Sequence, residues 1–362
     1  MQQPQGFRDP QFPQHVCKLQ KAIYGLRQTP RAWYTKLRNF LLSIGFIISK
    51  SDNSLFIHLQ KKFTMFLLIY VDDIIIIDTS SQQVQRFITT LAHRFSLKDL
   101  GPLAYFLRVE AIHTSSDLFL FQYKYIRDLL EKHNMFGANA ISTSISSTVS
   151  LKLHDGALPT DPTKYRQVIG SMQVLWYLKG TIHLGLFHRN HSPLTLHAFA
   201  NADWAGNFDD RTSTSVYVVF LGCNPISWSS KKQKTVARSS TEAEYRAIAT
   251  TAAEINWVQN LFYELQAQSL STPTIYWDNV GATYVCANPV FHSCMKHIAI
   301  DFHFVRDQVS KKLLCVSHIH TFDQLVDSLT TPLPRLQFLN HRSKIGIQDG
   351  SSILRGHERK TR

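Results

Sequence analysis

Residues 63–78 read FTMFLLIYVDDIIIID, two runs of strongly β-forming residues that meet at Asp72 and Asp73. This pattern predicts a β-hairpin with both carboxylates at a tight turn, because aromatic and β-branched residues favour strands. The apolar runs place these acids close to a core, where carboxylates are unfavourable unless a cation neutralises them. Two Mg²⁺ ions for phosphoryl transfer fit this arrangement. The alternative is a hairpin whose turn is simply acidic.

The composition of the whole chain narrows the class of partner. Its 362 residues include 39 Lys and Arg against 26 Asp and Glu, a net charge of +13. This excess favours a polyanionic partner, with nucleic acid first and an anionic membrane second. The apolar share of 44% excludes wholesale disorder, and the length allows two or three domains.

Cysteine spacing and hydropathy predict the cellular compartment. The five cysteines form no CxxC pair, so neither a zinc knuckle nor a disulfide framework is indicated. The polar, proline-rich start MQQPQGFRDPQFPQ does not have the pattern of a signal peptide. The most apolar stretch, Met65 to Ile77, is too short for a transmembrane helix. We therefore expect an intracellular protein, cytoplasmic or nuclear, without a membrane partner.

The second half of the chain has the pattern of a mixed α/β sheet. Three strand-like runs (LTLHAFANA, TSVYVVFLG and PISWSSK) precede an alanine-rich helix expected from Thr241 to Leu265. A strand (PTIYWDN), helical stretches, another strand (LLCVSHIHT) and a short helix at 323–329 follow. This order is typical of an α/β fold with a mixed sheet. Residues 136–165 read as a Ser-, Thr- and Pro-rich connector, and the basic segment from Arg342 predicts a disordered tail.

Four blocks in the first part of the chain follow one known family in order and spacing. They are KLQKAIYGLRQTPRAWY (18–34), LLIYVDDIIII (67–77), FSLKDLGPLAYFLRVE (95–110) and QYKYIRDLL (122–130). These blocks resemble the palm of a reverse transcriptase, and more narrowly the polymerase of copia-type retrotransposons. The resemblance implies that Asp72 and Asp73 are two of the three catalytic acids that hold Mg²⁺.

The same resemblance implies nucleic-acid contacts on either side of the hairpin. The segment from Tyr24 to Pro30 lies beneath the incoming nucleotide and template in that family, and basic residues face phosphates. The residues so implicated are Tyr24, Gly25, Arg27, Gln28, Arg31 and Lys98. Without the resemblance, a solvated basic helix is the simpler interpretation of this segment.

Two features depart from the polymerase pattern. The family's first palm acid lies upstream of the segment that matches Met1 to Phe7, so we expect no primer extension from this sequence. Arg108 stands where the family usually has Gly, and a bulky side chain there disturbs a tight backbone approach.

The second half resembles the ribonuclease H domain that follows a copia-type polymerase. The matching blocks are ADWAGNFDDRTSTSVYVVFLG (202–222), PISWSSKKQKTVARSSTEAEYRAIA (225–249), IYWDN (275–279), KHIAIDFHFVRD (296–307) and FDQLVDSLTTPL (322–333). The resemblance implies an α+β palm remnant followed by a ribonuclease H-like mixed α/β sheet. The expected domains are a palm and thumb remnant (1–135), a shortened connector (136–192), a ribonuclease H-like domain (193–335) and a basic disordered tail (336–362).

Ribonuclease H chemistry needs three or four carboxylates that converge on two Mg²⁺ ions. Helical spacing places Glu244 on the face that packs on the sheet, whereas Glu242 faces elsewhere. The alternative for Glu244 is an acid favoured there by the helix dipole. Asp278 follows the strand IYW, and Asp327 matches the family's terminal acid. His318, on the preceding loop, is a candidate for proton transfer or product release, although a lone His is more often a surface residue.

The first acid of this set is replaced. In the family it lies two residues before the Asp of Asp-Trp-Ala-Gly, and here that position holds Asn201. Asp203 is a possible substitute if the strand continues that far, because alternate strand residues share a side. Ala299 and Thr331 also replace the family's usual residues.

The function expected from the two resemblances is that of a retrotransposon-derived reverse transcriptase and ribonuclease H fragment. It acts on RNA·DNA hybrids and is catalytically impaired, because its metal sites lack acids. RNA, DNA and their hybrid are the expected partners, bound through phosphates and 2′-hydroxyls rather than by base readout. The alternative is a non-enzymatic nucleic-acid-binding remnant with the same fold.

Overall fold

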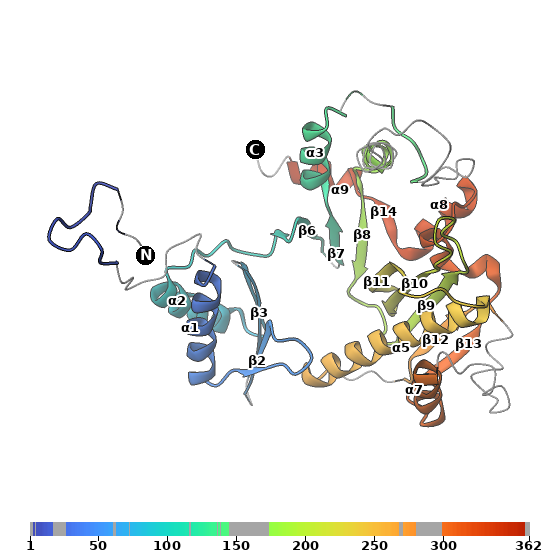
Figure 1. The fold of residues 1–362 in the computed structure, drawn as a ribbon, viewed down its shortest axis with the longest axis horizontal. Helices are drawn as coiled ribbons and strands as arrows, with labels where there is room; N and C mark the ends of the chain where they lie inside the picture. The colour runs from blue at the N-terminus through green and yellow to red at the C-terminus, as the bar shows by residue number, and fades with distance from the viewer. Residues whose placement is uncertain are drawn as a thin grey trace. The chain divides into compact units, whose positions relative to one another are not determined.

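The chain divides into two compact units in the computed structural model (Figure 1). The structure describes residues 3, 5–16, 27–60, 63–71, 73–115, 117–135, 137, 139–144, 174–267, 271–279 and 299–358. The units are Met1–Gly101 and Pro102–Arg362. Within the described part of the chain, no helix has the length and apolarity needed to cross a membrane.

The first unit is an antiparallel sheet with two helices. Its strands follow the order β1 (Ile47–Ile48), β2 (Leu55–Gln60), β3 (Phe63–Tyr70) and β4 (Asp73–Asp78), and its helices are α1 (Thr29–Ser43) and α2 (Ser81–Phe95). Strands β3 and β4 form the predicted hairpin, with Tyr70 paired to Asp73. Val71 in the turn has a φ of 51°, which is the left-handed conformation that such tight turns require.

One face of this sheet carries the core of the first unit. Alternate residues of β3, namely Met65, Leu67 and Ile69, are buried because successive side chains of a strand point to opposite faces. They pack with Leu37 of α1 and Leu91 of α2, so both helices cover the same face.

The second unit begins with a five-stranded antiparallel sheet in the order β14-β8-β7-β6-β5. Its strands are β5 (Tyr105–Phe106), β6 (Val109–His113), β7 (Asp117–Phe121), β8 (Leu184–Arg189) and β14 (Ile347–Asp349), and α3 (Tyr123–Lys132) follows β7. The predicted functional boundary at 135/136 differs from the structural one at 101/102. The reason is that β7 pairs with β8 along its whole length, which attaches this segment to the second unit.

The turn between β5 and β6 explains the family's glycine at position 108. Leu107 and Arg108 both have positive φ, 49° and 67°, in a two-residue turn between paired Phe106 and Val109. Glycine adopts this conformation without strain, whereas Arg does not. The Arg108 guanidinium lies over the ring of Tyr125, 4.9 Å from its centroid.

The predicted mixed sheet is confirmed in the second unit. Strands β9 (Leu196–Asp203), β10 (Thr214–Leu221) and β11 (Asn224–Lys232) are antiparallel neighbours. Strands β12 (Thr274–Trp277) and β13 (Cys315–His318) run parallel to β9, which gives the order β11-β10-β9-β12-β13. The predicted alanine-rich helix is α5 (Ser240–Glu264), and α7 (Ala299–Ser310) follows.

The two faces of the mixed sheet are covered by different elements. Ala198 and Ala200 of β9 are fully buried against α5, which lies across this sheet (Figure 1). The opposite face packs against the 3₁₀ helix η4 (Leu325–Leu329) and against Ile345 of α8 (Arg335–Ile345). Together with the 3₁₀ helix η3 (Thr321–Asp323), η4 replaces the single short helix predicted at 323–329.

The predicted disordered tail is wrong for residues 336–358. This segment forms α8, β14 and α9 (Ser351–Glu358). Strand β14 pairs with β8, with Ile347 opposite Leu186. Ile345 packs on the core beneath η4, and His341 is fully buried. The basic composition of the segment predicted disorder, but Ile345 and His341 pack against the rest of the unit.

Candidate active site

The four positions expected to carry ribonuclease H acids lie at one end of the mixed sheet. Asn201 is near the end of β9, and Asp278 directly follows β12. These strands are parallel neighbours with Tyr276 opposite Phe199, so residues 278 and 201 lie at the same level. All four side chains, those of Asn201, Glu244, Asp278 and Asp327, are half-buried.

These four residues form the candidate site, which we call the acid cluster (Asn201, Glu244, Asp278 and Asp327). The Nδ2 of Asn201 donates a hydrogen bond to Oδ1 of Asp327, at 2.9 Å. The indole Nε1 of Trp277 donates to Oε2 of Glu244, at 3.0 Å. The backbone carbonyl of Asp278 lies 3.2 Å from Nε2 of His318, which places the predicted His at the cluster.

The electrostatics of the cluster show that its acids interact. Burial raises the pKa of Glu244 to about 7, and the charge of Asp278 adds to this effect. Burial also raises the pKa of Asp327, and the charge of Asp278 acts in the same direction, opposed by the hydrogen bond from Asn201. Glu244 and Asp327 are therefore poorly solvated, and a nearby cation would favour their ionised forms.

The donor chemistry of the cluster fits Mg²⁺, because this ion prefers carboxylate oxygens. The carboxylates that would hold it are Glu244, Asp278 and Asp327. Among the described residues, however, no three His, Cys, Asp or Glu side chains converge closely enough to enclose a metal ion. Asn201 presents an amide N–H to Asp327, at the position where the resemblance implies an acid.

Asp203, the possible substitute, makes its contacts in the turn that follows β9. It shares a side of β9 with Asn201, as alternation predicts. Its carboxylate accepts a hydrogen bond from the backbone N–H of Thr214, and burial raises its pKa. A Cβ added at Gly206 would collide with it, so Asp203 fills the turn that follows β9. These contacts tie its carboxylate to the β9–β10 connection.

The expected difference between Glu242 and Glu244 is present in the structure. Glu242 is buried and pairs with Arg246 at 2.6 Å, and it also accepts a hydrogen bond from the backbone N–H of Arg238 at 2.8 Å. Ser239 caps the helix by accepting from the N–H of Glu242. Glu242 therefore stabilises the start of α5, while Glu244 faces the acid cluster.

The raised pKa of Glu244 predicts a stability that depends on pH. Its folded pKa of about 7 exceeds the reference of 4.5, so the folded state binds the proton more tightly. The stability that the protonated form provides is complete below pH 4.5 and is lost as the pH rises through 7. In EDTA, we expect Glu244→Gln to be more stable than the parent at pH 8 by about 1.5 kcal/mol, a value reduced for partial solvent exposure.

Urea unfolding at pH 8 and pH 4.5 checks this expectation. The advantage of Glu244→Gln should disappear at pH 4.5, where the parent side chain is protonated. Glu254→Gln is a matched control on the same helix, because Glu254 accepts a hydrogen bond from Ser227 and lies away from the cluster. An equal advantage at both pH values would show that the Glu244 carboxylate is well solvated.

Sequence reasoning missed two buried residues beside the cluster. Gln324 is fully buried, and its Nε2 donates to the carbonyl of Ala200 at 3.1 Å and to Oδ1 of Asp278 at 3.4 Å. His341 of α8 is also fully buried, with Nε2 at 3.3 Å from the carbonyl of Phe322. No periodic sequence pattern marks Gln324 as buried, and His341 lies in the segment that was predicted to be a disordered tail.

The residues predicted for the polymerase site are in the first unit and are only partly described. Tyr24, Gly25 and Asp72 lie outside the described residues. Asp73 is exposed at the hairpin turn rather than close to the core. The remaining predicted contacts are exposed side chains, at the start of α1 (Arg27, Gln28 and Arg31) and after α2 (Lys98).

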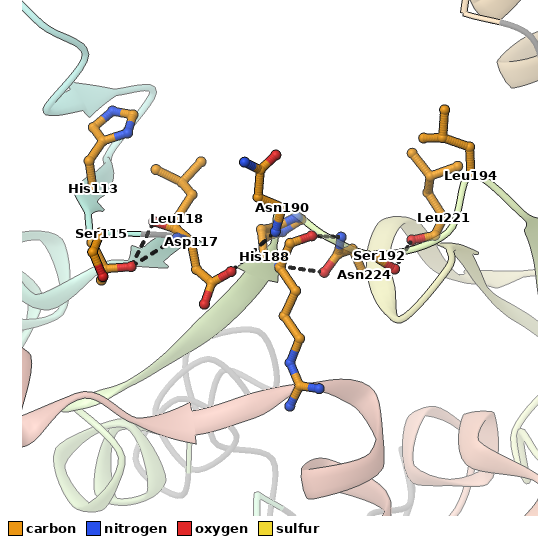
Figure 2. Close-up of a pocket in the computed structure, with 12 residues that line it drawn as sticks. His113, Ser115, Asp117, Leu118, His188, Asn190, Ser192, Leu194, Leu221 and Asn224 are labelled. Carbon is orange, nitrogen blue, oxygen red and sulfur yellow. Dashed lines mark hydrogen bonds between the residues drawn. The ribbon is translucent and has the colours of Figure 1, made fainter.

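A cavity of about 490 Å³ lies elsewhere in the second unit, between β7, β8 and the β10–β11 turn (Figure 2). Its polar groups bond to one another: Oδ1 of Asp117 accepts from the N–H of Asn190 at 3.2 Å, and Asn224 bonds both backbone groups of Arg189. Leu221, which lines the cavity, is at the opposite end of β10 from the residues that pair with Asn201. The cavity is therefore separate from the acid cluster.

Comparison with known proteins places the chain among retrotransposon sequences. A family model described as "Reverse transcriptase (RNA-dependent DNA polymerase)" matches residues 1–147. Two Arabidopsis thaliana proteins, the retrovirus-related Pol polyproteins from transposons RE1 and RE2, are 47% and 46% identical over 96% of this chain. The chain spans 26% of the length of each relative.

Among solved structures, LC11-RNase H1, isolated from compost by a metagenomic approach, is similar to this chain with a TM-score of 0.30. The identity is 13%, and the match covers 38% of this chain and 93% of that one.

Proposed function

Because the chain belongs to the family of retrovirus-related Pol polyproteins from retrotransposons, we propose that its second unit binds RNA·DNA hybrids and cuts their RNA strand only weakly. The observation that carries this proposal is the hydrogen bond from Asn201 to Asp327 in the acid cluster. A neutral amide lies against Asp327 at the position where the resemblance implies a carboxylate.

The arrangement of the cluster supports phosphodiester chemistry. Three half-buried carboxylates lie at the end of parallel strands, a common place for sites in α/β sheets. Bound Mg²⁺ would activate a water and stabilise the leaving oxygen of the RNA strand. Glu244, Asp278 and Asp327 hold the ions in this proposal, and His318 beside Asp278 is placed to move a proton.

The same cluster explains why cleavage by this chain is weak. Two dications need full negative charges among their ligands, and the Asn201 carbonyl oxygen is neutral. The Asn201 N–H also occupies one oxygen of Asp327 that would otherwise face a cation. Asp203 does not compensate, because its carboxylate holds the turn at Thr214 and Gly206.

A second candidate function is nucleic-acid binding without catalysis. The Asn201 amide satisfies Asp327 without any cation, so the cluster is compatible with a domain that binds a hybrid and does not cut it. In either case we expect an intracellular protein, in the cytoplasm or nucleus, whose partners are RNA, DNA and their hybrid.

The functional segments follow from this proposal. Residues 1–135 correspond to the reverse transcriptase part, in which Asp72 and Asp73 would bind Mg²⁺. Residues 136–192 connect it to the ribonuclease H-like part at 193–335. Residues 336–358 are an ordered extension of the second unit, since β14 completes the sheet that begins at β5.

An assay of the purified chain on an end-labelled RNA·DNA hybrid separates the two candidates. Slow cleavage in Mg²⁺ that stops in EDTA supports a weakened nuclease. Hybrid binding without cleavage at any Mg²⁺ concentration supports the binding protein. A chain that neither binds nor cuts a hybrid contradicts both.

Binding to hybrid should depend steeply on salt, because the chain carries a net charge of +13. Contact with about three phosphates gives a slope of about −2.7 for log K against log salt, or a loss of about 40-fold between 50 and 200 mM. Fluorescence anisotropy with hybrids of unrelated sequence measures this slope, which should not vary with sequence. A flat salt dependence would count against phosphate recognition.

A further inference from the structure

Gln324, between η3 and η4, is a polar side chain with no exposed surface in the middle of the second unit. Its Nε2 donates to the carbonyl of Ala200 and to Oδ1 of Asp278, whereas its Oε1 is buried without a partner among the described residues. An apolar side chain of the same size would avoid this unpaired oxygen. The Nε2 end of the amide therefore makes the contacts that favour Gln at this position.

The contacts of Gln324 link its own segment to β9 and to the end of β12, which carry three of the four members of the acid cluster. Ala200 precedes Asn201 on β9, and Asp278 directly follows β12. Gln324 itself lies three residues before Asp327 on the segment that leads into η4. Because both of its partners are acceptors, the amide has only one orientation that satisfies them.

We propose that Gln324 is a positioning residue that sets the separation of Asp278, Asp327 and position 201, and thereby the Mg²⁺ affinity of the acid cluster. The part about Mg²⁺ rests on the proposed function, while the part about separation does not. Without the amide, Asp278 loses a donor that orients its carboxylate, and the segment before Asp327 loses its bond to β9.

The rest of the segment is held independently of Gln324, which makes the residue testable. On its outer side, Lys344 of α8 pairs with Asp323 at 2.9 Å. His341 of α8 lies 3.3 Å from the carbonyl of Phe322. We therefore expect Gln324→Met, which keeps the length of the side chain and removes its donor, to fold.

Gln233 offers a matched control in the same domain. Its Nε2 also donates to one backbone carbonyl, that of Ala243, and to one side-chain oxygen, that of Ser215, both at 2.8 Å. It does not bond to any member of the acid cluster. Gln233→Met therefore removes the same kind of hydrogen bonds without removing any bond to Asn201, Asp278 or Asp327.

The first measurement needs neither metal nor cleavage. In the otherwise unmodified chain, the Asn201 Nδ2 protons are protected by their bond to Asp327, so their hydrogen exchange reports the distance between these residues. We expect Gln324→Met to accelerate this exchange, followed by NMR, by about 10-fold or more. Gln233→Met should leave it within about 2-fold of the parent.

The second measurement uses the chain with Asn201→Asp. There, Gln324→Met should weaken Mg²⁺ binding in calorimetry by about 10-fold and raise the Mg²⁺ concentration for half-maximal cleavage equally, while KM for the hybrid stays unchanged. A role limited to stability would instead lower the melting temperature and leave Mg²⁺ affinity as it was.

The two arms separate failure of this inference from failure of the proposed function. If Asn201→Asp neither binds Mg²⁺ nor cuts, the proposed function is wrong, and the exchange of the Asn201 amide still decides the role of Gln324. Parental exchange in Gln324→Met, or equal acceleration in Gln233→Met, would overturn the inference. If Gln324→Met does not fold, Gln324→Asn is used, since its shorter amide cannot reach both acceptors and should give the same acceleration.

Discussion

Cleavage of hybrid RNA in Mg²⁺ should rise about 10³-fold when Asn201 is replaced by Asp, which corresponds to about 4 kcal/mol of transition-state stabilisation. The substitution is nearly isosteric, so the packing of β9 is preserved. It exchanges an N–H that points at Asp327 for a second carboxylate oxygen. At pH 8, where proton uptake is disfavoured, a cation relieves the new repulsion between the acids, and Mg²⁺ binding should appear together with cleavage.

The physical reason lies in the charge of the cluster. Burial raises the pKa of Glu244 and of Asp327, so ionising these acids is unfavourable in the folded state. A fourth carboxylate should lower the stability of the folded state when metal is absent and raise it when Mg²⁺ is bound. In EDTA, Asn201→Asp should therefore be less stable than the parent, and saturating Mg²⁺ should reverse this difference.

Two controls make the result interpretable. Asn207→Asp adds the same charge to the β9–β10 connection, where Asn207 caps a turn through the N–H of Asp209, and it should not create cleavage. If the unmodified chain already cuts well and Asp203→Asn abolishes this activity, Asp203 is the metal ligand and our assignment of Asn201 is wrong. If Asn201→Asp folds but stays inactive, the defect lies with Ala299, Thr331 or the connector.

The parts of the site that sequence could predict depend on local periodicity. The alternating pattern of β9 placed Asn201 and Asp203 on one side of a strand, which the structure confirms. Helical spacing separated Glu244 from Glu242, and this separation is also observed. Both deductions need only the geometry of a single element.

The parts that sequence could not predict depend on contacts between distant segments. Strand β14 forms because it pairs with β8, at residues 184–189. No sequence pattern within 347–349 predicts this pairing. The pairing of β7 with β8 is also a contact between distant segments. It places β7 in the second unit, so the boundary lies at 101/102 rather than at the predicted 135/136. Gln324 was missed because a single buried amide has no periodicity.

The segment KKQKTVARSSTEAEYRA (231–247) matches the family closely, and Arg246 within it has a structural role. Its guanidinium pairs with Glu242 at 2.6 Å, and both side chains are nearly buried. It also donates to the carbonyl and the hydroxyl of Thr235, at 3.0 and 2.7 Å. Arg246 thus connects the loop before α5 to the first turns of that helix, which also carry Glu244.

Replacing Arg246 with Met should destabilise the second unit by about 3 kcal/mol, because it leaves the Glu242 carboxylate buried without its cation. The double variant with Glu242→Gln should recover much of this loss, since no uncompensated charge remains. Hydrogen exchange of α5 amides in the full chain measures the free energy of opening for this unit alone.

The exposed pair of Lys311 and Asp307 supplies the comparison that tests the role of burial. It has the same spacing of four residues and a similar separation of 2.8 Å, but both side chains are about half exposed. Solvent screens such a pair, so Lys311→Met should cost less than about 0.5 kcal/mol. If Arg246→Met costs no more than Lys311→Met, the Glu242 pair does not hold the start of α5. Glu244 would then owe its place in the acid cluster to the packing of α5 on β9 and to the bond from Trp277.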